Sequence, residues 1–277
     1  MQHIRRQLNH IQQEYTELRK ILNNQKDESI VAVWGLMNAG KSYLLNMLTQ
    51  HLENEYFKTN DFRETAEIKT AQFGNITYLD TPGLDASNTD DLEALRGVAR
   101  ADVVLFVHQP QGELEKIEID FLQQLKNSFG DHAEKNIILV ISKVDKATPE
   151  NIQLVENKML AQCNDILGFS PKCFQISNTR FRKGMIEHKN ALTKASRINE
   201  LNDYVHQVAS ESKGVSKQRI AVKLAELAEE SDDVIKRLEQ QQNKLIRNLA
   251  DEFDSFNQTV DDLRDYVTDI QKRYRAI

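Results

Sequence analysis

The stretch IVAVWGLMNAGKSYLLNML, residues 30–48, decides the fold of this chain. An apolar, β-branched run leads into a glycine turn, and an apolar-periodic segment follows the turn. This order predicts a buried strand, a tight loop and an amphipathic helix. Residues 35–42, GLMNAGKS, fit the spacing G-x-x-x-x-G-K-[ST], in which glycines let successive main-chain N–H groups face phosphate oxygens. The sequence therefore predicts a phosphate-binding loop.

Each polar residue of this loop has an expected task. Lys41 would reach the β- and γ-phosphates of a nucleoside triphosphate, and the Ser42 hydroxyl would ligate Mg²⁺. The helix that begins here adds the positive end of its dipole. The residues expected to bind nucleotide in this segment are Gly35, Asn38, Ala39, Gly40, Lys41, Ser42 and Tyr43.

The composition indicates a globular chain. It has 277 residues, of which 40% are hydrophobic and 28% charged, enough for one domain with an appendage. The net charge of −6 argues against nucleic acid as the main ligand. Cys163 and Cys173 lack metal-binding spacing, which favours a reduced, cytoplasmic protein. No apolar run approaches the roughly 20 residues of a transmembrane segment.

The placement of glycine and proline divides the chain into three regions. All ten glycines and four prolines lie in the middle, and both flanks carry apolar residues at heptad spacing. We expect an N-terminal helix over 1–27, an α/β domain over 28–210, and a C-terminal helical region over 215–277. The last is either one rod of about 95 Å or a hairpin folded near 249–257. The flanking helices would pair with each other, or each would cover the central domain or a neighbouring subunit.

The middle region alternates strand-like and helical segments. This pattern predicts a mostly parallel sheet with helices on both faces. Gly74 and Asn75 separate the second and third strands, so these two should form an antiparallel hairpin. Expected strands are 30–34, 66–73, 75–79, 102–107, 136–141 and 173–177, and expected helices are 41–52, 88–98, 113–128, 149–166 and 190–209.

Two later segments identify the nucleotide as GTP or GDP. NITYLDTPGLD ends a strand with Asp80, which would hold Mg²⁺ through water, and Gly83 would offer its N–H to the γ-phosphate. IILVISKVDK ends another strand and carries Lys143, expected to lie over the base, and Asp145. A carboxylate there can accept hydrogen bonds from guanine N1 and N2, a pair that adenine does not present.

With these motifs, residues 28–210 resemble the translation-factor-like (TRAFAC) P-loop GTPases. The resemblance implies that residues 35–42, 80–83 and 142–145 are the first, third and fourth guanine-nucleotide motifs. Ser177 and Asn178 would belong to the fifth, where a main-chain N–H reads guanine O6. The chain departs from the family at Ser142, commonly Asn or Thr, and at Asn178, commonly Ala.

The second guanine-nucleotide motif requires a threonine that completes the Mg²⁺ shell and senses the γ-phosphate. The candidates are Thr59, Thr65 and Thr70. We prefer Thr65, because it lies just before the second strand, whereas Thr70 has the phase of a structural strand residue. Thr65 is thus expected in catalysis, together with Lys41 and Asn38.

Asn38 and Leu84 bear on the hydrolysis mechanism. Ras-like switches carry a water-positioning glutamine at the position of Leu84, so intrinsic turnover should be slow. The spacing G-x-x-N-x-G-K-S-x-L-x-N-x-L is similar to that of the Era, MnmE and septin branch and of bacterial dynamin-like proteins. The resemblance implies that Asn38 helps to coordinate K⁺ beside the phosphates. The alternative is that its side chain merely braces the loop.

These features allow three functional hypotheses. A G domain between heptad helices resembles a small dynamin-like assembly GTPase, active as a homodimer through G domains or helical flanks. It would be cytoplasmic, or peripheral at a membrane through a partner protein or membrane-associated subunit. The second is an Era-like switch in ribosome or RNA maturation. The third is a GTP-binding coiled-coil scaffold with little turnover.

Two further segments have less specific interpretations. His108 and Gln109 end the fourth predicted strand, where a loop or interface role is expected. The basic segment TRFRKG, residues 179–184, is expected to form a solvated loop beside the base site.

Overall fold

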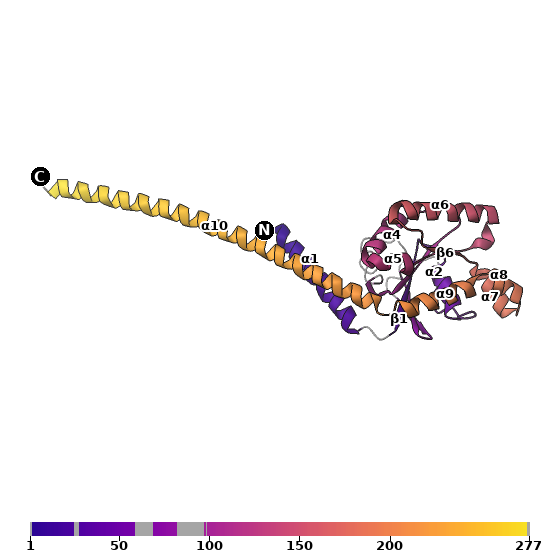
Figure 1. Cartoon of the computed structure of the whole chain (residues 1–277). Helices are drawn as coiled ribbons and strands as arrows, with labels where there is room; N and C mark the ends of the chain where they lie inside the picture. The colour runs from indigo at the N-terminus through magenta and orange to yellow at the C-terminus, as the bar shows by residue number, and fades with distance from the viewer. Residues whose placement is uncertain (1, 25–27, 59–68, 82–96, 98, 276–277) are drawn as a thin grey trace. The chain divides into compact units, whose positions relative to one another are not determined.

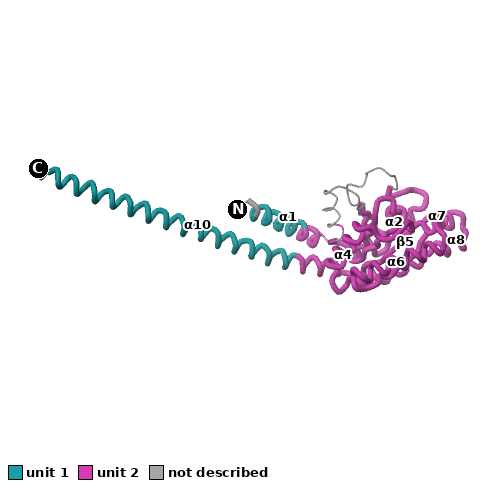
Figure 2. The backbone as a smooth tube through the Cα atoms, turned by 90° about the horizontal axis from the view of Figure 1, so that it is seen from above, with its two compact units in different colours: residues 1–17, 224–277 teal, residues 18–223 magenta. Residues whose placement is uncertain are grey.

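The computed structural model describes residues 2–24, 28–58, 69–81, 97 and 99–275. The chain divides into two compact units (Figure 2). One consists of residues 18–223 and the other of residues 1–17 together with 224–277. Each unit is described separately.

The larger unit is built on a six-stranded sheet with the order β2-β3-β1-β4-β5-β6. All described neighbours pair in parallel except β2 and β3, which form the expected antiparallel hairpin. The mostly parallel α/β fold predicted from the sequence is therefore confirmed. The strands are β1 (Ser29–Trp34), β2 (Lys69–Phe73), β3 (Ile76–Asp80), β4 (Val103–His108), β5 (Ile137–Ile141) and β6 (Lys172–Gln175).

Helices cover both faces of this sheet (Figure 1). Side chains of β1 alternate between two cores, with Ile30 and Trp34 on one face and Val31 and Val33 on the other, as the two-residue period of a strand requires. The first core packs against α4 (Lys116–Phe129) and α6 (Pro149–Leu167). The second packs against α2 (Lys41–Leu48), α7 (Asn178–Ile186) and α9 (Ile198–Glu211), and the short helices α5 (Ala133–Asn136) and α8 (Asn190–Ala195) complete the unit.

Two sequence-based expectations were wrong in this unit. Residues 190–209 form two helices, not one, because Arg197 adopts a left-handed conformation (φ 57°) that ends the first and precedes the second. The segment 179–184 is not a loop but part of α7. Its first turn is capped by the Ser177 hydroxyl, which accepts a hydrogen bond from the Arg180 N–H at 3.1 Å.

The first residues of α10 (Val215–Arg275) belong to the larger unit. The buried carboxylate of Asp102 accepts hydrogen bonds from the main-chain N–H of Ile30 at 2.9 Å and of Ser216 at 2.8 Å. Arg219 donates to the carbonyl oxygens of Ala101 and Ser128, each at 2.8 Å. These contacts fix the start of α10 against the N-terminal ends of β1 and β4 and the last turn of α4.

The smaller unit contains the beginning of α1 (Gln2–Asn24) and most of α10. The Gln7 amide donates to Glu230 at 3.2 Å, and Ile11, Leu227 and Val234 are buried. Within the region 215–275, α10 is one continuous helix, without a hairpin. Among the described residues, no helix is both long and apolar enough to cross a bilayer.

Candidate nucleotide-binding site

The loop of residues 35–42 connects β1 to α2, as the sequence predicts. Gly35 has φ +148°, and a Cβ there would lie 2.0 Å from the carbonyl oxygen of Val107, so only glycine fits against β4. Gly40 (φ 95°) precedes the first residue of α2, and Asn38 also has a positive φ of 61°. The main chain therefore wraps tightly at the N-terminus of α2, as phosphate binding requires.

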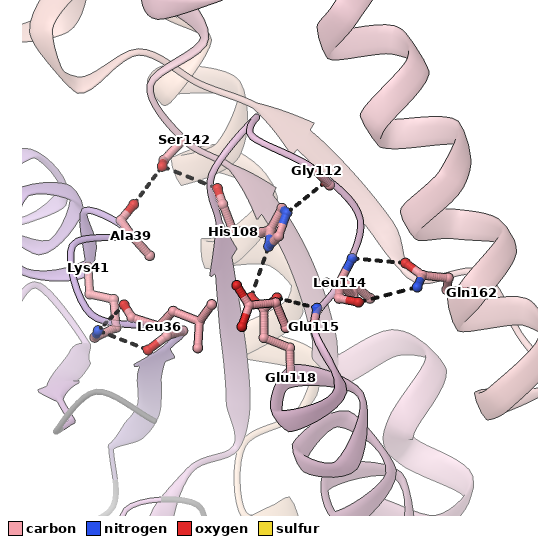
Figure 3. A network of polar contacts seen from close by, with 11 residues as sticks. Leu36, Ala39, Lys41, His108, Gly112, Leu114, Glu115, Glu118, Ser142 and Gln162 are labelled. Atoms are coloured by element: carbon pink, nitrogen blue, oxygen red, sulfur yellow. Dashed lines mark hydrogen bonds and ion pairs between the residues drawn. The ribbon is translucent and has the colours of Figure 1, made fainter. Parts of the chain in front are cut away.

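Lys41 lies inside this loop. Lys41 as a whole is 8% exposed, and its ammonium group donates to the carbonyl oxygens of Gly35 at 2.9 Å and Leu36 at 2.8 Å (Figure 3). The ammonium therefore stays against the loop rather than in bulk solvent. Ala39 is buried and Tyr43 is half-buried against the core beneath the loop.

Ser42 and Asp80 meet at the ends of neighbouring elements. The Ser42 hydroxyl donates to Asp80 Oδ2 at 2.8 Å. Asp80 is buried, and its other oxygen, Oδ1, has no hydrogen-bond partner among the described residues. Burial raises the pKa of Asp80, although the Ser42 hydrogen bond and the charges of Lys41 and Lys69 act in the opposite direction. A buried carboxylate oxygen without a partner, beside a hydroxyl, fits a divalent cation with oxygen ligands.

The residues expected at the base lie after β5 and β6. Lys143, with φ 54°, donates to the Asn38 carbonyl oxygen at 2.5 Å and so joins this segment to the phosphate loop. Asp145 Oδ1 accepts a hydrogen bond of 2.5 Å from the Ser177 hydroxyl. This bond engages one of the two carboxylate oxygens of Asp145 and links the segments that follow β5 and β6, where the base is expected to bind.

The two residues that depart from the family pattern, Ser142 and Asn178, lie beside the phosphate loop. The Ser142 hydroxyl donates to the carbonyl oxygen of Ala39 at 2.5 Å, so serine supplies a donor at a position where Asn or Thr is common (Figure 3). A Cβ at Gly40 would lie 3.7 Å from the Ser142 hydroxyl oxygen and 3.8 Å from the Asn178 amide nitrogen. Both side chains therefore border the space beside the Cα of Gly40.

Some expected site residues are not described. Thr59, Thr65, Gly83 and Leu84 all lie outside the described residues. Thr70 lies in β2, and its carbonyl oxygen accepts a hydrogen bond from the Tyr56 hydroxyl at 2.9 Å.

His108 has a different role from the one expected. It is not in an exposed loop or interface but 6% exposed at the end of β4. Its Nδ1 lies 2.9 Å from Glu118 Oε1 and its Nε2 3.1 Å from the Gly112 carbonyl oxygen (Figure 3). A carboxylate and a carbonyl oxygen both accept, so the ring must donate twice, as only the imidazolium can.

The electrostatics of this contact agree with its geometry. Burial lowers the pKa of His108, but the hydrogen bond and the charge of Glu118 raise it by more. The net pKa therefore lies above the ordinary value of 6.5. Glu118 Oε2 also accepts from the Glu115 N–H at 2.9 Å, which caps α4. The spacing of ten residues between His108 and Glu118 gives no local sequence signal for this pair.

Asn46 is a second residue whose role was not predicted. It is 1% exposed on α2. Its amide nitrogen donates to the Phe57 carbonyl oxygen at 2.7 Å, and its amide oxygen accepts from the Phe57 N–H at 2.9 Å. Asn46 therefore fixes the chain that follows α2. Its place in the S-x-L-x-N pattern was the one signal for it.

Comparison with known proteins agrees with this geometry. A family model described as 50S ribosome-binding GTPase matches residues 30–143. An uncharacterised protein from Acinetobacter baylyi is 30% identical over 230 residues, which cover 79% of this chain and 53% of that protein. GTPase Era from Clostridium acetobutylicum is 31% identical over 129 residues, covering 44% of this chain and 42% of Era. The chain thus spans about half the length of these curated relatives.

Solved structures share the fold at low identity. LeoA, a bacterial dynamin GTPase from ETEC, superposes with a TM-score of 0.53 at 16% identity, covering 84% of this chain and 48% of LeoA. Toc33 from Arabidopsis thaliana, in complex with GDP and Mg²⁺, gives a TM-score of 0.50 at 18% identity, covering 74% of this chain and 93% of Toc33. Residues 30–143 therefore match the model of a 50S ribosome-binding GTPase domain, the larger unit has the P-loop GTPase fold, and the chain is similar in sequence to Era, Der and MnmE.

Proposed function

We propose that this protein hydrolyses GTP to GDP and phosphate as a dynamin-like assembly GTPase, activated when two G domains pair. The observation that carries the proposal is the convergence of Lys41, the Ser42–Asp80 pair and the Asp145–Ser177 pair around one loop. In a parallel sheet, ligands bind beyond the carboxyl ends of the strands. Strand β3 ends at Asp80, and Lys41 and Asp145 lie in the segments that follow β1 and β5.

The phosphate side would use the charges already present in the loop. Lys41 would turn from the Gly35 and Leu36 carbonyl oxygens to the β- and γ-phosphates. Ser42 would ligate Mg²⁺, Asp80 would hold it through water, and Thr65 would complete its shell. Mg²⁺ supplies positive charge that neutralises the triphosphate. The Gly83 N–H would contact the γ-phosphate.

The base side would select guanine. The Asp145 carboxylate, already fixed through one oxygen by Ser177, would accept hydrogen bonds from guanine N1 and N2. Lys143 would lie along the base, and the main-chain N–H at Asn178 would reach O6. Because an amino group at position 2 distinguishes guanine from adenine, removal of this carboxylate should abolish the discrimination.

Hydrolysis would depend on self-association and on K⁺. Leucine at position 84 cannot orient water, so another group must supply that function. The described hydrogen bond of Asn38 uses its main-chain oxygen, and its side chain is exposed. This arrangement supports K⁺ coordination by the Asn38 amide oxygen, which would add positive charge beside the phosphates.

One specific observation favours a second function, an Era-like switch in ribosome or RNA maturation. The sequence relatives include GTPase Era, and the matching family is described as ribosome-binding.

The structural neighbours include a bacterial dynamin pair whose title describes long-range sensing and tethering of membranes, with a TM-score of 0.53. That likeness supports the assembly GTPase, cytoplasmic or at a membrane through a partner subunit.

GTP turnover per molecule, measured over a wide range of protein concentration in matched KCl and NaCl buffers, tests the proposal. The rate should rise with concentration and be higher in KCl. Asn38→Ala should remove the difference between the salts, whereas Asn75→Ala, at the opposite end of β3 from Asp80, should keep it. A slow rate that is independent of concentration would exclude self-activation and favour the Era-like switch. No turnover, with GTP still bound, would indicate a scaffold.

A further inference from the structure

The distal part of α10, residues 246–274, carries an exposed apolar stripe. The stripe keeps a strict heptad spacing from Ile246 onward, which places it on one side of the helix. Apart from Val260, the apolar residues of the stripe from Ile246 to Ile270 are between 46% and 62% exposed, and Tyr274 is 82% exposed. Val260 is partly exposed. The remaining members are Leu249, Phe253, Phe256, Leu263 and Val267.

The described contacts between α1 and α10 cover the apolar face of α10 only before residue 246, where the stripe begins. The described contact between the two helices includes the Gln7–Glu230 hydrogen bond and the buried residues Ile11, Leu227 and Val234, all N-terminal to the stripe. An apolar stripe of nine heptad positions exceeds what a monomeric surface normally exposes. It therefore requires a partner helix.

We propose that residues 246–274 pair with the same segment of a second copy, in antiparallel orientation. This inference deepens the proposed assembly GTPase by naming a helix contact separate from the G domains. The argument for a second copy comes from the distribution of charge and of side-chain size along the stripe.

Charge along the segment is complementary only when one helix is reversed. Residues 248–263 contain five acidic and no basic side chains, whereas residues 270–275 contain three basic and no acidic ones. Parallel pairing would place acidic against acidic and basic against basic. Antiparallel pairing places the basic end beside the acidic region of the partner, which favours this orientation.

Side-chain size selects the register. In the antiparallel register that pairs Val260 with Leu263 of the second copy, each large residue faces a smaller or flexible one. The resulting layers are Leu249 with Tyr274, Phe253 with Ile270, Phe256 with Val267, and Val260 with Leu263. A parallel pair would instead stack Phe on Phe in two successive layers and Val on Val in the next, which packs unevenly.

The same register brings Glu252 and Arg273 together beside the stripe. Reversal of one helix sets the flank that carries Glu252 against the same flank of the partner. Each dimer would then contain two Glu252–Arg273 pairs. Arg273 lies 2.8 Å from Asp269 within its own helix, but both side chains are exposed, so this intrahelical pair is weak and exchangeable.

Charge exchange tests the register. In sedimentation equilibrium without nucleotide, the wild-type chain should approach twice its mass of 31.9 kDa. Glu252→Arg or Arg273→Glu should each weaken the dimer by about tenfold, because two attractive pairs become repulsive. The double variant Glu252→Arg/Arg273→Glu should restore it. A monomeric wild type, or a double variant no better than the singles, would overturn the proposal.

Disulfide cross-linking tests the orientation. A mixture of Leu249→Cys and Tyr274→Cys chains should form a mixed disulfide, because these positions share a layer. Leu249→Cys alone should not cross-link, and if it does the pairing is parallel and the proposal fails. If the wild-type chain forms the dimer but does not turn over GTP, the proposed function alone is refuted. If it turns over GTP but stays monomeric without nucleotide, the helix pairing alone is refuted.

Discussion

Asp102 should contribute more to stability than any local sequence pattern suggests, because it binds two main-chain N–H groups in the interior. It is completely buried, and its two carboxylate oxygens accept from Ile30 and Ser216 at 2.9 and 2.8 Å. Asp102→Ala leaves both donors buried without this acceptor. A hydrogen bond to a charged group contributes about 1.5–3 kcal/mol, so the loss should be about 4 kcal/mol.

Urea unfolding followed by fluorescence measures this loss. Trp34, the one tryptophan of the sequence, is buried in the same unit as Asp102, so its emission reports that unit. The free energy of unfolding should fall by about 4 kcal/mol in Asp102→Ala and by a smaller amount in Asp102→Asn, which keeps one acceptor oxygen. Asp131→Ala, an exposed carboxylate, should change it by less than about 0.5 kcal/mol. A loss below about 1 kcal/mol in Asp102→Ala would refute the reasoning.

Three further substitutions probe the site. Asp145→Ala should weaken GTP binding by at least about a hundredfold, since two charge-assisted hydrogen bonds are lost. Isothermal titration with GTP and ATP would show whether selectivity disappears. A GTP affinity equal to that of the wild type would contradict the role of Asp145 in base recognition. The raised pKa of His108 means that its stabilisation is complete below about pH 6.5 and is lost as the pH rises through its folded value. Wild-type stability relative to His108→Gln should therefore decrease between pH 6 and 9 in urea titrations, and a constant difference would count against the ion pair. Asn46→Ala should cost about 2–4 kcal/mol in the same assay, and a near-neutral result would mean that its facing main-chain groups find other partners.

The fold was predictable where the sequence carries short-range periodicity. The run 30–34 and the glycine loop that follows it predicted β1, the loop and α2 closely. Gly74 and Asn75, between two closely spaced strand-like runs, predicted the β2–β3 hairpin, and Gly74 has a φ of 59° that suits a tight turn. The α/β alternation then limited the sheet to a few parallel arrangements. These features depend on residues that are close in sequence.

The errors arose where tertiary contacts decide the structure. The basic segment 179–184 looks polar, yet Phe181 is buried in the core and Ser177 caps the helix, so the segment is helical. In the sequence His108 is a polar residue at a strand end, and nothing nearby indicates its buried contact with Glu118. A local pattern cannot report a partner that lies ten or more residues away.

Helix α4 contacts β4, the strand against which the phosphate loop packs, near its first turn, and it contacts the start of α10 at its last residues. Near its first turn, Glu118 binds His108, which ends the strand against which the loop packs. At its last residues, the Arg219 guanidinium lies 3.6 Å from the Phe129 ring centroid and donates to the Ser128 carbonyl oxygen at 2.8 Å. Burial lowers the pKa of Arg219 to about 10, so the side chain stays charged at neutral pH. A rigid helix held at both ends by charged groups provides the contiguous contacts that any communication between a nucleotide and α10 requires.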